Sequence, residues 1–184
     1  MSDYMVSETT GQAAVRYRPS VIALHWISAF LIIAQIFVGL KFGDMPKGPA
    51  RMDLFAWHKL IGVAILLLAL ARLGVRLMNP PPPYPADMPT WERAVAVWTH
   101  RLFYFLIIAL PVTGLAAVSG RAVGGMTDLK FGLKFPVVPI PGIGESHELL
   151  AWGLIGLLAL HVLAALKHQF IGDSPVKRRM SPVG

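Results

Sequence analysis

The chain has 184 residues and a net charge of +7, and 55% of its residues are hydrophobic whereas only 15% are charged. A soluble globular protein carries about 25% charged residues, so the composition excludes an ordinary soluble domain. The absence of cysteine excludes disulfides, iron–sulfur clusters, thiolate zinc sites and covalently attached haem. On such a chain the positive charge concerns membrane topology, and we expect no nucleic-acid partner.

The chain begins with polar residues 1–15, which we expect to be mobile, and ends with a basic tail at residues 173–184. Four apolar blocks lie between them, at residues 22–40, 54–77, 94–118 and 149–170. Each block is near the ~20 residues that a helix needs to cross a bilayer. None alternates as a barrel strand does. The sequence therefore predicts an all-α membrane protein with a four-helix transmembrane domain over residues 16–172. We expect the first block to be retained, since about 20 polar and charged residues precede it.

Prolines mark the segments between these blocks. The run at residues 80–83 ends the second block and favours a stiff, extended linker. Pro111 lies inside the third block and predicts a kink or a local break. Residues 119–146 combine glycine, proline, aromatic residues and lysine. This mixture is typical of a segment that lies on the membrane surface or caps a helix bundle.

The distribution of positive charge predicts the orientation. Ten of the 17 lysines and arginines lie in the N-terminal segment, the middle loop and the C-terminal segment, or in the helix ends next to them. The positive-inside rule then places both termini in the cytoplasm, and an even number of spans agrees with this.

All six histidines lie in or at the edge of a predicted helix: His25, His58, His100, His147, His161 and His168. An ionisable side chain is costly within a membrane, so such residues mark function. An α-helix turns by ~100° and rises by ~1.5 Å per residue. The three histidines of the fourth block therefore share one stripe, with a rise of ~21 Å between His147 and His161.

The predicted depths of the histidines pair them across the bundle. His58 lies near the outer start of its helix, level with His147, and His25 lies in the inner half, level with His161. Two imidazoles that face each other in an apolar interior, without thiolates, suit a b-type haem. Two such pairs predict two haems, one near each face. His100 also lies toward the inner face, so the sequence leaves open whether His100 or His25 ligates the inner haem.

Other kinds of site fit less well. An ion transporter usually places carboxylates in mid-membrane, whereas Glu92, Glu145 and Glu148 lie at helix ends. A structural zinc site does not spread its ligands over ~21 Å. Arg72, and less so Arg76, is a candidate partner of a haem propionate. The alternative for both arginines is anchoring at the membrane surface.

Two histidines remain toward the inner face once the pairs are formed. A quinone headgroup needs a hydrogen-bond donor and a proton route, and His100 and His168 can supply both. The alternative is contact with lipid headgroups or water. Glycines within the helices allow close approach of a flat macrocycle or tight helix packing: Gly39, Gly62, Gly114, Gly153 and Gly156.

Specific stretches add a family resemblance. They are "SVIALHW" in the first block, "WHKLIGVAILLLALARLGVRL" in the second, "HRLFYFLIIALPVTGL" in the third and "SHELLAWGLIGLLALHVLAALKHQF" in the fourth. Over residues 18–182 the chain resembles the prokaryotic cytochrome b561 family, the four-helix di-haem proteins of bacterial inner membranes.

The resemblance implies haem iron ligation by His58 with His147 on the outer side and by His25 with His161 on the inner side. It implies electron exchange with ubiquinone, for which His100 is one matching extra histidine and His168 the other. It also implies oxidation of superoxide at the outer face. A cationic surface would steer that anion, and the candidates are Arg51, Lys59, Arg121, Lys130 and Lys134.

A second function remains open at this point. The family is also similar to the di-haem membrane subunits of hydrogenases and formate dehydrogenases, which collect electrons from a large partner protein. The short chain shows no added docking segment, which favours a stand-alone protein over such an anchor. Homodimerisation is left open.

Overall fold

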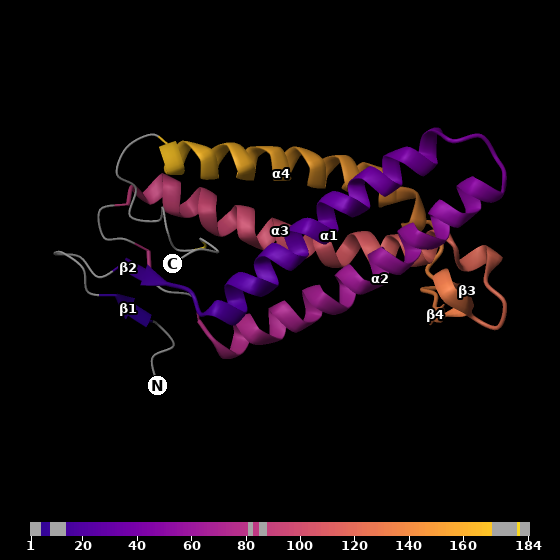
Figure 1. Cartoon of the computed structure of the whole chain (residues 1–184), viewed down its shortest axis with the longest axis horizontal. Helices are drawn as coiled ribbons and strands as arrows, with labels where there is room; N and C mark the ends of the chain where they lie inside the picture. The colour runs from indigo at the N-terminus through magenta and orange to yellow at the C-terminus, as the bar shows by residue number, and fades with distance from the viewer. Residues whose placement is uncertain (1–4, 8–13, 81–82, 85–87, 171–179, 181–184) are drawn as a thin grey trace.

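The computed structural model describes residues 5–7, 14–80, 83–84, 88–170 and 180. Within them, four long helices run side by side (Figure 1): α1 Pro19–Asp44, α2 Pro49–Met78, α3 Thr90–Ala117 and α4 His147–Phe170. These bounds overlap the four predicted blocks and differ by a few residues at the ends, where helix limits are least sharp. The predicted four-helix all-α architecture is confirmed.

Short elements lie at the two ends of the bundle (Figure 1). At one end, β1 (Met5–Ser7) pairs antiparallel with β2 (Ala14–Arg16). At the other, β3 (Met126–Asp128) pairs antiparallel with β4 (Lys134–Pro136), among the turns η1 (Ser119–Arg121), η2 (Lys130–Gly132) and η3 (Ile143–Ser146). The mobility predicted for residues 1–15 stays a prediction. Apart from Met180, the predicted tail lies outside the described residues.

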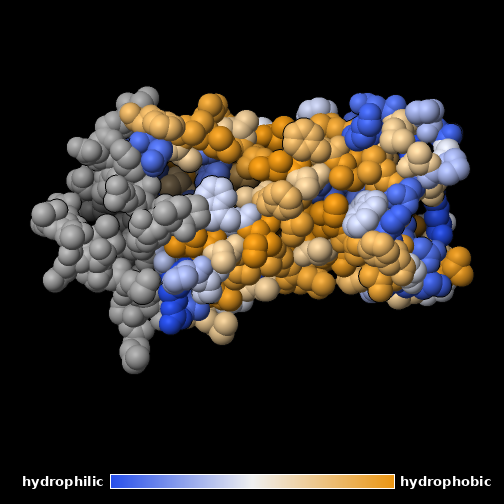
Figure 2. Space-filling model, viewed as in Figure 1, coloured by the Kyte–Doolittle hydropathy of each residue, from blue (hydrophilic) through white to orange (hydrophobic). Residues whose placement is uncertain are grey.

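The surface of the bundle matches a bilayer. Figure 2 shows a hydrophobic middle section, with hydrophilic residues gathered toward the ends. Large apolar side chains are widely exposed there, including Phe30 at 72% and Phe37 at 69%. Each of the four helices is long and apolar enough to cross a membrane. Because such surface is stable against lipid and not against water, this is a multi-pass membrane protein.

The most buried of the four helices is α3. Its most apolar window is 44% buried, against 6% for α4. Leu106, Ile107 and Leu110 pack with Ala69 of α2 and Leu154 of α4 in the main core cluster. The helix continues through Pro111, so the predicted local break is wrong, whereas the alternative, a kink, stays a prediction. Neighbouring packing holds the turn although proline supplies no N–H.

Residues 119–146 cap the beginning of α2 and the end of α3. Leu129 joins a core cluster with Val63 of α2 and Leu115 of α3. Lys130 forms an ion pair with Asp53, and Lys59 donates to the backbone carbonyl of Asp128. Of the two interpretations of this segment, the cap is the one that these contacts favour.

Candidate functional site

Two imidazoles face each other beneath the cap. His58 lies ten residues into α2, and His147 is the first residue of α4. Their ring centres are 6.1 Å apart, and the ring planes are inclined by 80°. The Nδ1 atom of His58 is buried and has no hydrogen-bond partner among the described residues. The helices thus place side by side the two histidines for which the sequence predicts the same depth. We call His58 and His147 the outer pair.

Glycines make room for both rings of the outer pair. A Cβ atom added to Gly39 of α1 would lie 3.1 Å from Cε1 of His58. A Cβ atom added to Gly114 of α3 would lie 3.1 Å from Cε1 of His147. Both distances are tighter than ordinary van der Waals contact, so each imidazole lies directly against a helix backbone. In contrast, a Cβ at Gly153 would meet nothing within 4 Å, so close approach accounts for only some of the predicted glycines.

Three imidazoles gather at the opposite end of the bundle. The ring centre of His161 on α4 is 6.4 Å from that of His25 on α1. It is 6.1 Å from that of His100 on α3. The ring of Phe103 also lies against His161, with 5.3 Å between centres. We call His25, His100 and His161 the inner cluster. His100 is thus an equal neighbour of His161, which the sequence alone leaves open.

Charged residues border the inner cluster. Arg72 of α2 lies near His25 of α1 and near Tyr104 of α3. Arg76 lies 5.9 Å from the centre of the same tyrosine ring. Beyond the cluster, His168 lies in the last turn of α4, after Lys167. The structure therefore keeps Arg72 beside the cluster and places His168 nearer the end of the bundle.

Comparison with known proteins decides the family. The family model described as prokaryotic cytochrome b561 matches residues 16–182. The chain belongs to this family. Cytochrome b561 homolog 2 of Escherichia coli (strain K12) is 28% identical over 177 residues, covering 90% of each chain. "Probable superoxide oxidase CybB" of Yersinia pestis is 30% identical over 178 residues, covering 91% of this chain and 96% of that protein.

Membership of the cytochrome b561 family makes the chain an oxidoreductase-type membrane electron carrier and implies b-type haem. The spacing of the imidazoles fits this group. A metal–imidazole bond is about 2 Å and a ring centre lies about 1 Å further on, so two imidazoles on opposite sides of one metal have centres roughly 6 Å apart. The outer pair at 6.1 Å and His25 with His161 at 6.4 Å both meet this requirement.

Haem and zinc differ in the number of protein ligands that they need. Within the described residues, no group of three or more His, Cys, Asp or Glu side chains is arranged to hold a metal ion. A zinc site would need four ligands, most of them from protein. A haem needs only axial ligands, because the porphyrin supplies the others. The predicted b-type haem agrees with what the family implies.

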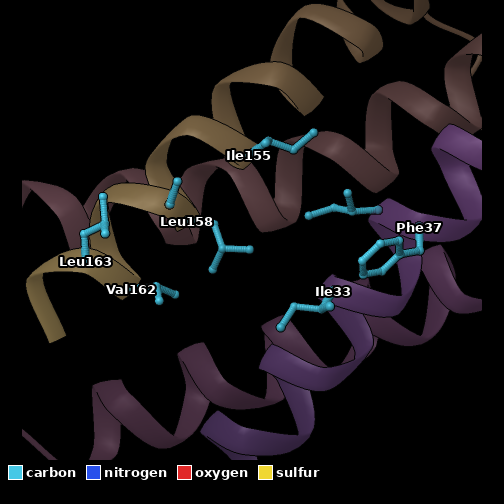
Figure 3. A pocket seen from close by; sticks show the side chains of 8 residues that line it. Ile33, Phe37, Ile155, Leu158, Val162 and Leu163 are labelled. Carbon is cyan, nitrogen blue, oxygen red and sulfur yellow. The ribbon is translucent and has the colours of Figure 1, made fainter. Parts of the chain in front are cut away.

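An apolar groove lies between two of the helices that carry histidines. It has a volume of 480 Å³ and lies between α1 and α4. Figure 3 shows Ile33 and Phe37 from α1 facing side chains of α4 across it. Its α4 wall includes Val162, the residue after His161. A groove of this size is within the range of small-molecule and cofactor sites. It adjoins the same two helices that carry His25 and His161.

Several contacts at the site have no clear signal in the sequence. Gln35 of α1 donates from Nε2 to the backbone carbonyl of His58, 2.9 Å away. Thr113 of α3 lies 3.1 Å from Nδ1 of His147. The one available signal for Thr113 is its place in the "ALPVTGL" stretch. Periodicity gives no means of knowing which helix a buried hydroxyl or amide faces.

Adding a side chain at Gly114 should displace the imidazole of His147. The Gly114→Val variant is expected to lower haem affinity at the outer pair by about 10–100-fold, the usual effect of disturbing the support of a metal ligand. Haem content by the pyridine haemochrome assay measures this. Gly153→Val is the matched control, because a Cβ there meets nothing. Equal haem content in both variants would contradict the close approach at Gly114.

Proposed function

We propose that the chain is a di-haem electron carrier of the bacterial inner membrane that oxidises superoxide at the outer face and reduces ubiquinone. His58 and His147 would ligate the outer haem, and His25 and His161 the inner one. When bound, b haem supplies reversible one-electron transfer at its iron. The observation that carries the proposal is the presence of opposed imidazoles near both ends of one bundle. Both chain termini would then lie in the cytoplasm.

The proposed reaction balances in two electrons. Each superoxide gives up one electron and becomes dioxygen. Two such electrons, with two protons, convert one ubiquinone to ubiquinol. The name of the Yersinia pestis relative supports the superoxide half of this scheme. The four spans support the membrane location that a lipid-soluble acceptor requires.

The outer face would attract a small anion only weakly. Seven lysines and arginines lie on this side against five acidic residues, within residues 41–59 and 118–148. Lys59 and Lys130 bind acceptors of the cap or of α2. Lys134 lies 3.9 Å from Asp128. Among the predicted candidates, Arg121 and Arg51 would therefore contribute most of the steering field, which salt would screen beyond about 8–10 Å.

The inner side offers groups for a quinone and for a propionate. Arg72 carries a guanidinium beside the inner cluster, where it would pair with a haem propionate. His100 has Nδ1 2.7 Å from the carbonyl oxygen of Ala96. A carbonyl only accepts, so Nδ1 is the donor and Nε2 is left to accept a hydrogen bond or a proton. His100, with His168 at the helix end, would serve the proton uptake that quinone reduction needs.

Purification from mild detergent and a turnover assay test the function. We expect a red protein with two haems per chain that reduces a ubiquinone analogue in the presence of generated superoxide. The rate should fall about two- to threefold as ionic strength rises from 0.01 to 0.15 M. Superoxide that leaves the haems oxidised would overturn the proposed donor. A tightly bound soluble partner, whose removal ends activity, would instead favour the hydrogenase-type anchor.

A further inference from the structure

We infer that Thr113 is a positioning residue for the imidazole of His147 and that it lowers the reduction potential of the outer haem through His147 Nδ1. This inference rests on the proposed role of His147 as an axial ligand. It concerns how α3 holds that ligand, which the family match does not address.

The hydrogen bonds of His147 define its tautomer. Nδ1 lies 2.9 Å from the backbone carbonyl oxygen of Leu110 and 3.1 Å from Oγ1 of Thr113. Because a carbonyl oxygen only accepts, Nδ1 carries the proton. The lone pair of a neutral imidazole is then on Nε2. Nε2 is therefore the nitrogen that can bind iron, and the contacts with α3 set this tautomer.

The hydroxyl of Thr113 completes this group of hydrogen bonds. Oγ1 donates its own proton to the carbonyl oxygen of Leu110, 2.9 Å away. Its lone pairs remain to accept from the Nδ1–H of His147. Thr113 is only 3% exposed, so the environment that surrounds these bonds is apolar. A hydrogen bond is stronger in such surroundings than in water.

Neighbouring residues of α3 make the arrangement accessible. Leu110 supplies a backbone carbonyl oxygen at this point of the helix, 2.9 Å from Nδ1 of His147. Gly114 leaves the space that the ring of His147 fills. We call Leu110, Thr113 and Gly114 the α3 seat. The "LPVTG" run thus places an acceptor, a hydroxyl and a gap within one and a half turns.

A purely local role is the alternative for Thr113. Serine and threonine in helices often bond to a carbonyl one turn back. Ser119 does so in the same region, with Oγ 2.7 Å from the carbonyl oxygen of Ala116. What distinguishes Thr113 is its second contact, with His147. Ser119 therefore provides a matched control for the loss of a hydroxyl.

The contact has a definite electronic consequence. An imidazole that donates its N–H to an acceptor is a more basic metal ligand. A more basic axial ligand favours the oxidised iron and lowers its reduction potential. Removing one acceptor should therefore raise the potential of the outer haem. The inner haem, which His147 does not touch, should keep its potential.

Redox titration of the purified holoprotein, followed by haem absorbance, tests the inference. In Thr113→Val, we expect both haems to be retained and one of two redox components to move upward. A tenfold change in the relative affinity for the two iron states corresponds to about 59 mV. Thr113→Ser keeps the hydroxyl and should restore the wild-type value. Ser119→Ala should leave both components unchanged.

The outcomes separate the inference from the proposed function. Unmoved potentials in a Thr113→Val protein with wild-type haem content would overturn the inference alone, as would an equal shift in Ser119→Ala. Loss of one haem in Thr113→Val, with both haems retained in Thr113→Ser, would support the positioning role of the Thr113 hydroxyl. Equal loss in both Thr113 variants would overturn it. A wild-type protein without haem would overturn both the proposed function and the inference.

Discussion

Replacing His147 with alanine is expected to remove one of two haems and to leave the other in place. His147 and His58 form the outer pair, and α3 orients the His147 ring through Nδ1. When one of the two imidazoles is removed, the haem loses one axial bond. A buried space is left beside the glycine against which that ring lay, Gly114 for His147 and Gly39 for His58. His58→Ala should have the same effect. Pyridine haemochrome quantitation against protein concentration should fall from two haems per chain to one.

The control for this experiment is another histidine of α4. His168 lies in the last turn of that helix, so His168→Ala should retain both haems. The remaining haem of the His147 and His58 variants should have one redox component, and it should be the same component in both. If the two variants lose different components, the two imidazoles do not share one iron. Retention of two haems in both would refute the outer ligand assignment.

The spans and the depths of the histidines were predictable because both are local properties. An apolar run of about 20 residues predicts a membrane span whatever its neighbours are. The rise per residue then gives the depth of each side chain along its own helix. This is why His58 was expected level with His147, and His25 level with His161. The ring contacts of the structure agree with these levels.

The lateral arrangement could not be predicted in the same way. How far each helix turns about its axis depends on packing against other helices, which one sequence does not express. His100 shows the consequence, because its depth allows a place in the inner cluster but does not require it. The cap also depends on distant contacts, such as Lys130 with Asp53. The hydrogen bond between Thr113 and His147 joins α3 to α4 in the same way.

Replacing His161 with alanine is expected to remove the inner haem, since both neighbouring imidazoles face this one residue. The second ligand of this haem is expected to be His25 and not His100. His25→Ala should lose the same haem as His161→Ala, whereas His100→Ala should keep it. The reason is helix packing: α1 and α4 leave an apolar groove between them, with Ile33, Phe37 and Val162 in its walls and none of the histidines. In contrast, α3 packs directly against α4 through Leu106, Ile107 and Leu154.

The roles of the two neighbours can be separated by a second readout. If His100 serves the quinone, His100→Ala should retain both haems and their potentials while quinone reduction slows by about 10²–10⁴-fold, the usual contribution of a general acid or base. Reduction of the haems by superoxide should be unaffected in that variant, because the outer pair is intact. Loss of the inner haem in His100→Ala, with retention in His25→Ala, would reverse the assignment. In that case His100 and His161 would be the inner ligands, and His25 would lie beside the haem.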